Sequence, residues 1–451
     1  MRIVVIGGVA AGMSAASQAK RRMPDAEVIA LERGAQVSYG ACGMPYNIEK
    51  PERDIEDLVV MSAKTFRDKR GIDVRTRHEV LSIDTEGRTV EVRDHGAGST
   101  YELSWDRLVI ATGAHAIRLD MPGMDEEGVF PLRDLEDGAA VKRWLADKEP
   151  GSAVILGGGY IGMEMAEVLR SRGLAVTVVE MADQVVPGFE PQIARIVREE
   201  LERHEVRVET GAKAQAVERE DGRLVLVTDK GRFSADLVLV AVGVKPSVAL
   251  AEAAGIALGE TGAIAVDRHM RTSAEDVYAA GDCAEDWHRV SGHAAWVPLG
   301  TTANKQGKVA GANAVGAEEA FAGIVGTAVF KVFGLEVGRT GLGAKDIERF
   351  ELDAVAAPSK QPSRAESYAG GTPVTTVVFA ERGTGSLLGA QMVAREGVAG
   401  RIDTFATALY AELTVEDVEN LDLAYAPPFA PVYDPVLIAA TVARKALASD
   451  A

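Results

Sequence analysis

The cysteine thiols are the most reactive side chains in this sequence, because a thiolate can attack a disulfide and can also act as the leaving group when a disulfide is cleaved. Cys42 and Cys283 are the only cysteines among the 451 residues. Cys42 lies in residues 38–46, SYGACGMPY, where small neighbours leave the sulfur accessible. We therefore expect a reactive thiol at Cys42. Nothing beside Cys283 activates sulfur, so we expect that cysteine to be structural.

Phosphate binding is indicated by one segment type that occurs twice. Residues 3–32 read IVVIGGVAAGMSAASQAKRRMPDAEVIALE, and residues 153–180 read AVILGGGYIGMEMAEVLRSRGLAVTVVE. Each has an apolar run, a glycine turn, an Ala- and Met-rich stretch and a second apolar run, which predicts a βαβ unit. Glycines allow the tight turn and the approach of a pyrophosphate to the helix N-terminus. The expected cradle residues are Gly7 and Gly12 in the first copy, and Gly157, Gly159 and Gly162 in the second.

The two copies differ at the middle glycine, since Val9 stands where the second copy has Gly159. Glu32 and Glu180 close the second apolar runs, and we expect each to accept hydrogen bonds from a ribose. No Arg or Lys follows Glu180 in the sequence EMAD, which favours NADH and leaves NADPH as the second choice. Two dinucleotide sites indicate that one nucleotide brings electrons and a tightly held one receives them.

The composition fits a large globular protein. At about 150 residues per domain, 451 residues give roughly three domains. The formal net charge of −18 opposes general binding to nucleic acid or to an anionic membrane, so neither partner is expected. No apolar run approaches the roughly 18 residues of a membrane span, and two cysteines make no disulfide framework. We expect a cytoplasmic protein without a metal site.

Two further motifs connect the repeats to a family. Ala111, Thr112 and Gly113 follow the apolar run LVI, and the stretch VYAAGD ends in Gly281 and Asp282. Together with the two cradles, these motifs resemble those of the FAD-dependent pyridine nucleotide-disulfide oxidoreductases, over the whole chain. The resemblance implies that both motifs bind FAD and that Asp282 holds its ribityl chain. A helix N-cap is the simpler role for this aspartate.

The same resemblance implies an α/β fold with two Rossmann-like dinucleotide-binding domains, arranged as in glutathione reductase, and a C-terminal α+β dimerisation domain. The FAD-binding domain is expected to be discontinuous, with residues 1–113 and 245–322. The NAD(P)H-binding domain is expected at 114–244 and the dimerisation domain at 323–451.

The stretch around Cys42 resembles the single-cysteine branch of this family, which contains coenzyme A disulfide reductases, persulfide reductases, NADH oxidases and NADH peroxidases. The dithiol branch has a second cysteine where this chain has Asn47, and a C-terminal His-Glu pair, whereas the last histidine here is His293. Peroxidases and water-forming oxidases of the branch usually have a histidine in the first glycine turn, which here reads VAA at 9–11. The coenzyme A members are therefore favoured.

The C-terminal region resembles the same members. Residues 425–429, YAPPF, and the following Tyr433-Asp-Pro resemble their YAPP…DP segment, and SYAG around Tyr368 resembles their Tyr-Pro-Gly stretch. By this resemblance, Tyr368 and Tyr425 reach Cys42 of the partner subunit in a homodimer with shared active sites, and Tyr433 contacts substrate. Phenolic hydroxyls hydrogen-bond or protonate a thiolate. Packing at the dimer interface is the alternative role.

Coenzyme A is an anion, so an acidic protein needs a local basic patch to bind it. The sequences KRR at 20–22 and RDKR at 67–70 offer such patches, and solvated helix faces are the plainer explanation of both. Ala41 replaces an asparagine that is common in the family, which predicts looser binding of pantetheine or a changed disulfide preference. The coenzyme A contacts implied by the resemblance are Ser14, Gln18, Arg21, Ser38, Arg70 and Asn304.

Two residues after the second glycine turn are also assigned by resemblance. Tyr160 matches a tyrosine that covers the flavin until NADH displaces it, with plain packing as the alternative. Glu164 matches a residue that seats the nicotinamide.

The expected activity is electron transfer from NADH through FAD to a disulfide formed on Cys42. Coenzyme A is substrate or bound helper, and the acceptor is coenzyme A disulfide, its persulfide or polysulfide. The alternatives are an NADH oxidase, a flavoprotein that reduces a protein partner, and a dimeric NAD(H) sensor. The last two do not require Cys42 to react.

Overall fold

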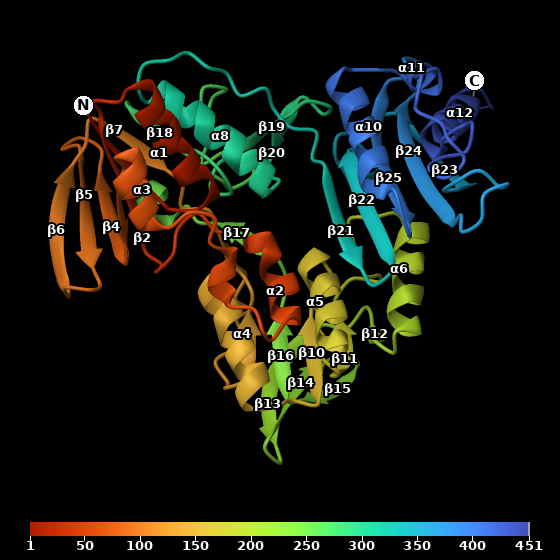
Figure 1. Ribbon diagram of the computed structural model, residues 1–451, viewed down its shortest axis with the longest axis horizontal. Helices are drawn as coiled ribbons and strands as arrows, with labels where there is room; N and C mark the ends of the chain where they lie inside the picture. Colours follow the sequence, from red (N-terminus) through yellow and green to blue (C-terminus); the bar gives the residue numbers. More distant parts are fainter. Residues whose placement is uncertain (450–451) are drawn as a thin grey trace.

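The computed structural model describes residues 1–449, which form three units. In Figure 1 the first unit lies at the upper left, the second at the bottom and the third, coloured cyan to blue, at the upper right. Helix α12 (Pro435–Ser449) is the last element of the third unit (Figure 1). No helix among residues 1–449 combines the length and apolarity that crossing a bilayer requires.

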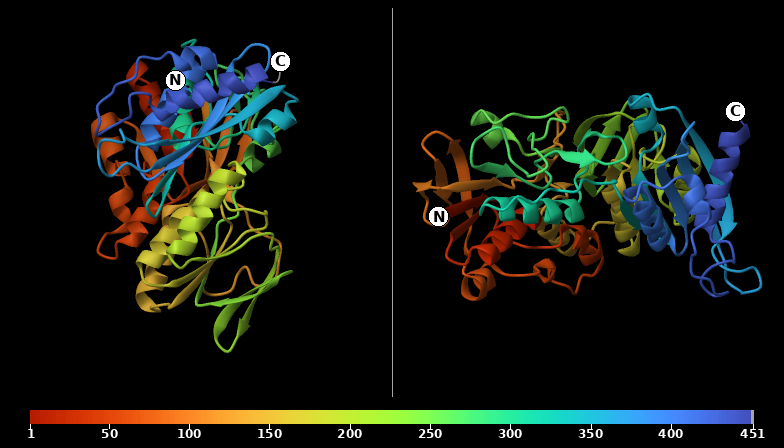
Figure 2. Two further views of the ribbon diagram at one scale, coloured as in Figure 1. Left: turned by 90° about the vertical axis from the view of Figure 1, so that its right-hand side faces the viewer. Right: turned by 90° about the horizontal axis from the view of Figure 1, so that it is seen from above.

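The first unit is built on a parallel sheet in the order β18-β7-β1-β2-β3. Helices α1, α3 and α8 cover one face, and the antiparallel sheet β4-β5-β6 packs on the other. Helix α8 approaches α1 closely, because a Cβ on Gly307 or Gly311 would lie 2.2 Å from a carbonyl oxygen of α1. The two helices lie side by side in Figure 2.

The elements of this unit are β1 (Arg2–Ile6), α1 (Ala10–Arg22), β2 (Glu27–Glu32), a 3₁₀ turn (Ala41–Gly43), α2 (Met44–Glu49), a second 3₁₀ turn (Ile55–Leu58), α3 (Ala63–Arg70), β3 (Asp73–Thr76), β4 (His78–Asp84), β5 (Thr89–Asp94), β6 (Ser99–Ser104), β7 (Arg107–Ile110), α7 (Ala249–Ala253), β18 (Val277–Ala279), β19 (Asp286–His288), β20 (His293–Ala295) and α8 (Gly300–Asn313).

The second unit repeats this plan. Its parallel sheet has the order β12-β11-β10-β16-β9, with helices on one face and the antiparallel sheet β13-β14-β15 on the other. The two predicted βαβ units are therefore confirmed as β1-α1-β2 and β10-α5-β11. The elements are β9 (Val129–Pro131), α4 (Leu135–Asp147), β10 (Ser152–Leu156), α5 (Tyr160–Ser171), β11 (Ala175–Val179), α6 (Pro191–Arg203), β12 (Arg207–Glu209), β13 (Ala214–Glu220), β14 (Arg223–Thr228), β15 (Gly231–Ala235) and β16 (Leu237–Val240).

The second unit is inserted into the first through two adjacent crossings. The chain leaves through β8 (Ala114–Ala116) and returns through β17 (Val244–Pro246), and these strands pair antiparallel. Both crossings therefore lie side by side.

The third unit contains an antiparallel sheet in the order β21-β22-β25-β24-β23, packed against α10 and α12. The hairpin of β21 and β22 contacts the second unit, where Glu167 pairs with Lys331 and accepts the N–H of Phe333 at 2.7 Å. Arg395, just after β25, adds a 2.9 Å bond to Glu200. The elements are β21 (Ala328–Val332), β22 (Leu335–Gly341), α9 (Ala344–Arg349), β23 (Ala354–Pro362), β24 (Pro373–Glu381), β25 (Leu387–Ala394), α10 (Val398–Tyr410), α11 (Val415–Glu419) and α12 (Pro435–Ser449).

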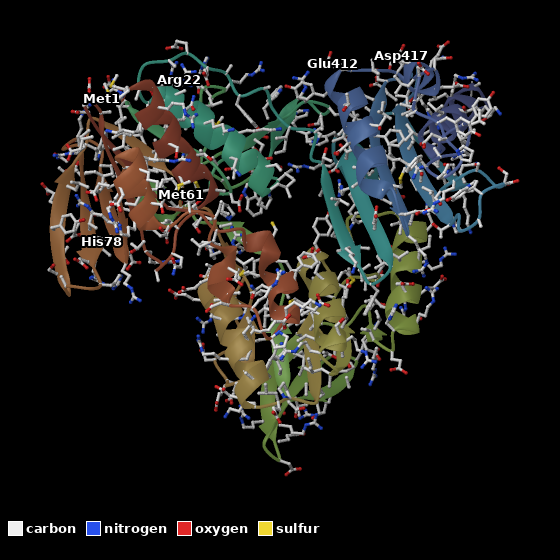
Figure 3. All side chains as sticks on the ribbon, viewed as in Figure 1. Met1, Arg22, Met61, His78, Glu412 and Asp417 are labelled. Atoms are coloured by element: carbon white, nitrogen blue, oxygen red, sulfur yellow. The ribbon has the colours of Figure 1, made fainter. Side chains whose placement is uncertain are left out.

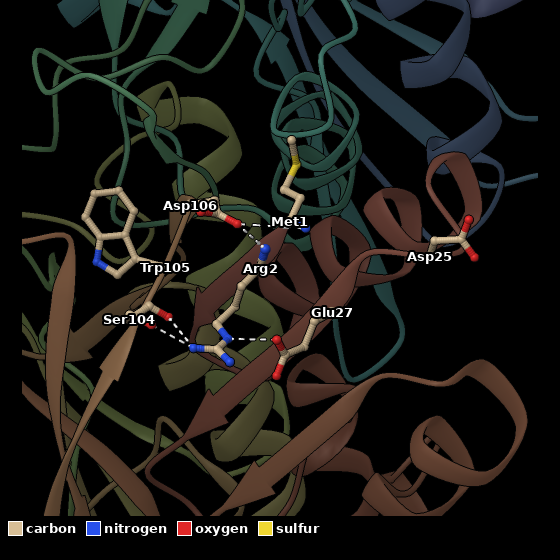
Figure 4. A pocket seen from close by; sticks show the side chains of 7 residues that line it. All are labelled: Met1, Arg2, Asp25, Glu27, Ser104, Trp105 and Asp106. Atoms are coloured by element: carbon tan, nitrogen blue, oxygen red, sulfur yellow. Dashed lines mark hydrogen bonds and ion pairs between the residues drawn. The ribbon is translucent and has the colours of Figure 1, made fainter.

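A surface hollow of about 310 Å³ lies beside the N-terminus, on the edge of the first unit (Figure 4). Arg2 spans it, since its guanidinium bonds Glu27 at 2.8 Å and Ser104 at 2.7 Å, and Asp106 accepts the Arg2 backbone N–H at 2.6 Å.

Candidate functional site

The two glycine turns are matching backbone cradles. Gly7 and Gly157 have φ angles of 106° and 111°, which residues with a side chain rarely adopt. A Cβ on Gly7 would lie 2.1 Å from the carbonyl oxygen of Ala111, and one on Gly157 would lie 2.4 Å from that of Ala241. Each turn therefore crosses directly over the end of a neighbouring strand, where only glycine fits.

The remaining glycines of the turns have distinct roles. A Cβ on Gly12 or Gly162 would lie 1.8 or 2.1 Å from the carbonyl oxygen of the first glycine of its turn, so both permit close helix–strand packing. A Cβ on Gly159 would meet nothing within 4 Å, which leaves the second turn open to a ligand. Val9 takes the corresponding position at the start of α1.

Glu32 and Glu180 hold their turns in the same way. One carboxylate oxygen accepts the N–H of the second glycine of the turn, at 2.7 Å from Gly8 and 2.6 Å from Gly158. The other accepts, at 2.7 Å, the N–H two residues after the glutamate. Burial raises the pKa of Glu32. Each carboxylate oxygen keeps a lone pair for the expected ribose hydroxyl.

Residues 111–113 have a counterpart that the sequence analysis missed, at 241–243. The N–H of Ala111 donates to the carbonyl oxygen of Ile6, the last residue of β1, at 2.8 Å. The N–H of Ala241 donates in the same way to Leu156, the last residue of β10, at 2.7 Å. Gly113 and Gly243 both have positive φ angles, of 68° and 109°. The signal was present, because ATG follows LVI and AVG follows LVLV. The internal repeat therefore includes a third strand in each unit.

Asp282 is held by a residue from the second unit that the sequence did not indicate. The N–H of Gly281 donates to Gln306 at 2.7 Å, and Asp282 accepts a 2.7 Å bond from Arg133, with 14% of the aspartate side chain exposed. Arg133 also donates to the carbonyl oxygen of Ala114 at 2.9 Å. The alternative role of Asp282 as a helix N-cap is wrong, because a turn follows and no helix begins there.

Cys42 lies in the 3₁₀ turn that leads directly into α2, and its side chain is exposed. Partial burial of the sulfur and the negative charge of Glu164 raise the pKa of the thiol, whereas Arg133 lowers it. Access to the sulfur is thus as expected. The lowered thiol pKa that would favour a thiolate is not present in the protein alone.

Neither Asn47 nor Cys283 supplies a redox partner. Asn47 is only 2% exposed and donates to the backbone carbonyl oxygen of Asp54 at 2.7 Å. Cys283 is fully buried, 3.5 Å from the carbonyl oxygen of Ile110 and 3.4 Å from that of Ala280, as expected for a structural cysteine. Both cysteines are free. Residues 1–449 also contain no cluster of His, Cys, Asp and Glu suited to a metal ion.

Glu164 and Tyr46 form a pair beside Cys42 that sequence reasoning did not find. The hydroxyl of Tyr46 donates to Glu164 Oε1 at 3.0 Å, which joins α2 to α5. Burial raises the pKa of Glu164 to about 7, despite this hydrogen bond. Glu164 therefore changes charge near neutral pH, within the electrostatic range of the sulfur.

Tyr160 packs against aromatic rings of the neighbouring elements. Its ring stacks on Phe330 of β21 with 4.9 Å between centroids, and meets the edge of Phe189 at 6.1 Å. The side chain stays 36% exposed. The packing alternative is thus observed, and the ring is only partly covered.

The expected coenzyme A contacts gather around α1. Ser14, Gln18 and Arg21 are spaced by four and three residues, which places them on one helix face. Ser14 Oγ hydrogen-bonds Asn304 Oδ1 of α8 at 2.7 Å, and Arg70 at the end of α3 reaches a serine of α1 at 3.3 Å. Three helices therefore contribute to a common surface.

Among the basic residues near this surface, Arg21 keeps its charge available. Its only hydrogen bond given by the structure is to the neutral Gln18, at 2.6 Å. Lys20 donates to a backbone carbonyl, and Arg22, near the end of α1 in Figure 3, pairs with Glu319. Arg21 and Arg70, which bonds only a serine hydroxyl, therefore both have a positive charge without an acidic partner in these contacts.

Ser38 connects this surface to the first glycine turn. Its N–H donates to the carbonyl oxygen of Gly8 at 2.9 Å, and its φ is 50°. Val186 makes the same bond to Gly158 at 2.8 Å, with a φ of 43°. The repeat thus extends beyond the glutamates, and only the first copy presents a hydroxyl there.

The three C-terminal tyrosines lie together and are exposed. Tyr368, Tyr425 and Tyr433 are 43%, 49% and 68% exposed. A buried pair, Arg401 with Asp434 at 3.0 Å, holds this region, and Arg401 also bonds the start of the Tyr368 loop at 3.0 Å. Figure 1 shows β23, β24 and α12, which flank these tyrosines, on the far side of the third unit from α2. Within one chain the segments that carry these tyrosines therefore lie away from α2, which follows Cys42.

Comparisons with known proteins decide the family. The family model described as pyridine nucleotide-disulphide oxidoreductase matches residues 1–307, and the model of its dimerisation domain matches 327–435.

This chain belongs to the pyridine nucleotide-disulphide oxidoreductase family.

Individual relatives of this family resemble the chain over its full length. An NAD(P)H coenzyme A polysulfide/persulfide reductase of Pyrococcus horikoshii is 39% identical, over 98% of each chain. An NADH oxidase of Methanocaldococcus jannaschii is 34% identical, over 100% of each chain. The solved NAD-dependent persulfide reductase from A. fulgidus is 37% identical, with a TM-score of 0.96 over 100% of this chain and 84% of that one.

Membership in the pyridine nucleotide-disulphide oxidoreductases makes the protein an oxidoreductase that uses FAD and a pyridine nucleotide, as the sequence predicted. The α/β fold with a C-terminal dimerisation domain is confirmed as well. The described residues fit two dinucleotides. Each unit has a tight turn in which only glycine fits, and a glutamate, Glu32 or Glu180, whose carboxylate can still accept hydrogen bonds from a ribose. Arg133 adds a cation beside the first cradle.

Proposed function

We propose that this protein is an NADH-dependent reductase of coenzyme A disulfide, coenzyme A persulfide or polysulfide, with Cys42 as its single redox sulfur. The observation that carries this proposal is that the exposed sulfur of Cys42 lies beside Glu164. Glu164 belongs to α5, the helix that follows the second glycine turn. The polysulfide/persulfide reductase of Pyrococcus horikoshii supports the substrate class.

The proposed cofactor contacts divide between the two cradles. FAD, when bound, accepts a hydride from the nicotinamide and passes an electron pair to sulfur. Glu164 and Tyr160 border the nicotinamide. The FAD contacts are Gly7, Gly12, Glu32, Ala111, Thr112, Gly113, Gly281 and Asp282, and the NADH contacts are Gly157, Gly159, Gly162 and Glu180. We propose accordingly that residues 1–113 with 245–322, 114–244 and 323–451 are the FAD, NAD(P)H and dimerisation domains.

The proposed substrate surface is the face of α1 with Arg21. Its guanidinium provides the positive charge that the phosphates of coenzyme A require in a protein of net charge −18. The surface continues through Ser38 toward the loop of Cys42, so a long substrate can bind phosphates at one end and place sulfur at the other.

The proposed reaction begins at the thiolate of Cys42, which attacks one sulfur of coenzyme A disulfide. The substrate S–S bond breaks, a Cys42–coenzyme A disulfide forms, and one coenzyme A thiolate leaves with a proton from solvent or a tyrosine. Two electrons from NADH then cleave the mixed disulfide and restore Cys42 as its thiolate, while the second coenzyme A takes a proton. One NADH and one proton are consumed for two coenzyme A thiols.

The active sites are proposed to be shared across a homodimer. Tyr368 and Tyr425 are exposed, and the segments that carry them lie away from α2 of their own chain, in a region that belongs to the dimerisation domain. Their hydroxyls then protonate or hydrogen-bond the thiolate on the partner, and Tyr433 contacts its substrate. A cytoplasmic location agrees with the two free cysteines.

An NADH oxidase is the second candidate, because the Methanocaldococcus jannaschii relative carries that name. The first glycine turn has no histidine to act on peroxide, which favours the sulfur substrate. Consumption of NADH is therefore measured with coenzyme A disulfide under argon and with oxygen as the only acceptor. Faster turnover with oxygen would contradict the proposal.

A further inference from the structure

The C-terminal end of α2, the helix that follows the Cys42 turn, is held by an ammonium group from the second unit. Lys142 of α4 points its Nζ at four oxygens, namely Asn47 O at 3.0 Å, Asn47 Oδ1 at 2.9 Å, Lys50 O at 2.9 Å and Arg53 O at 2.6 Å. The last turn of a helix leaves its carbonyl oxygens without partners inside the helix. Two of these carbonyl oxygens, those of Asn47 and Lys50, also accept a backbone N–H, so the ammonium adds a second, charged partner at the end of α2 and in the loop behind it.

A second cation of the same unit assists. Arg172, at the end of α5, donates to the carbonyl oxygen of Ile48 at 3.0 Å. Near the other end of α2, Tyr46 bonds Glu164 at 3.0 Å. The helix that starts next to Cys42 is thus fixed to α4 and α5 along its length, although it belongs to the first unit by sequence.

Asn47 connects Lys142 to the loop that follows α2. It is 2% exposed, accepts from Lys142, and donates through Nδ2 to the carbonyl oxygen of Asp54 at 2.7 Å. This is the position at which the dithiol branch has its second cysteine. A side chain with both donor and acceptor here links α2, the following loop and α4 in one buried network.

We propose that Lys142 is a positioning residue, which, through Asn47 and the carbonyl oxygens behind α2, fixes the sulfur of Cys42 relative to the NADH-binding unit. This inference rests on the proposed role of Cys42. Small displacements of reacting groups are costly, since about 1 Å can reduce a rate roughly 100-fold. The network lies on the opposite end of α2 from the sulfur, so Lys142 acts only through the helix.

The test compares Lys142→Met with Lys142→Arg and with the control Lys148→Met, which changes an exposed lysine at the end of the same helix. On the FAD-loaded enzyme, Lys142→Met is expected to increase amide hydrogen exchange in residues 44–53 and to lower kcat with coenzyme A disulfide by about tenfold to 100-fold. The KM for NADH should stay within about twofold of the wild-type value, because the substitution leaves the second glycine turn unchanged. Lys142→Arg should recover most of the rate.

A milder variant keeps the test decisive if Lys142→Met does not fold. Asn47→Leu removes one of the four acceptors and should show the same pattern more weakly. The proposal is overturned if exchange in residues 44–53 and kcat both remain within about twofold of Lys148→Met in the folded variants. The hydrogen-exchange result stands whether or not coenzyme A disulfide is a substrate, so failure of the proposed function is distinguishable from failure of the positioning role.

Discussion

The hydroxyl of Tyr46 donates a 3.0 Å hydrogen bond to Glu164, and this bond joins α2, which follows the Cys42 turn, to α5, which follows the second glycine turn. The pair also lies within the electrostatic range of Cys42, whose thiol pKa is raised in part by the charge of Glu164. The protonation state of one carboxyl group is therefore coupled to the reactivity of the thiol.

Glu164→Gln is expected to increase the alkylation rate of Cys42 at about pH 8 by roughly threefold to tenfold, because one unit of pKa corresponds to a factor of ten in ionisation. Removing the negative charge lowers the pKa of the thiol. The rate constant with iodoacetamide is measured against Glu136→Gln, an exposed carboxyl on α4. Equal rates in the two variants would show that the charge of Glu164 does not reach the sulfur.

The stability of the protein should also depend on Glu164. Its pKa is raised from 4.5 to about 7 in the folded state, so the folded protein binds the proton more tightly than the unfolded chain. The resulting stabilisation is complete below pH 4.5 and is lost as the pH rises through about 7. Glu164→Gln should therefore gain thermal stability relative to wild type between about pH 5 and about pH 8. A Tm difference that does not change with pH would contradict this.

Arg133→Met should weaken FAD binding. The substitution leaves Asp282 without its 2.7 Å partner in a site where only 14% of the aspartate side chain is exposed. Losing one partner of a part-buried pair leaves a charge poorly compensated. We expect the Kd for FAD to rise about tenfold or more, as measured by flavin release during gel filtration. Full flavin occupancy at limiting FAD would rule out this role.

Met181→Arg should improve the use of NADPH. Met181 is 68% exposed and directly follows Glu180, at the position where a 2′-phosphate would need a cation. The KM for NADPH is expected to fall by roughly tenfold, since charge-assisted bonds to phosphate are strong. Met181→Gln is the control, because it has similar size without the charge. Equal KM values for NADPH in both variants would place the ribose elsewhere.

Mixed dimers test the sharing of active sites. Subunits with Cys42→Ser are combined with subunits carrying Tyr368→Phe and Tyr425→Phe. If each site takes its sulfur from one subunit and its tyrosines from the other, a mixed dimer keeps one intact site and about half the wild-type rate. If each site lies within one chain, every site in the mixed dimer has a defect and the rate is no better than that of the parent variants.

Local chemistry allowed the glycine turns to be identified from the sequence. Gly7 and Gly157 adopt positive φ angles that glycine readily permits, and the apolar runs on either side of each turn pair as parallel strands. The spacing of glycines between apolar runs was therefore enough to predict both turns. The segment 241–243 also carried a signal, which was missed because its middle residue differs from that of 111–113.

Residues that act across the units carried no such signal. Arg133 and Lys142 are ordinary polar residues in and just before α4, and they meet Asp282 and Asn47 only because the second unit is inserted into the first. The raised pKa of the Cys42 thiol has the same origin, since it depends on burial and on Glu164, which is distant in sequence.

The central claim is that Cys42 carries electrons from NADH to a coenzyme A disulfide. The most direct measurement is anaerobic NADH oxidation with coenzyme A disulfide as the only acceptor, for wild type, Cys42→Ser and Cys283→Ala, each with FAD bound. The account predicts turnover by wild type and by Cys283→Ala, and a loss of at least about 1,000-fold in Cys42→Ser. Turnover by Cys42→Ser at a rate close to that of wild type would contradict it.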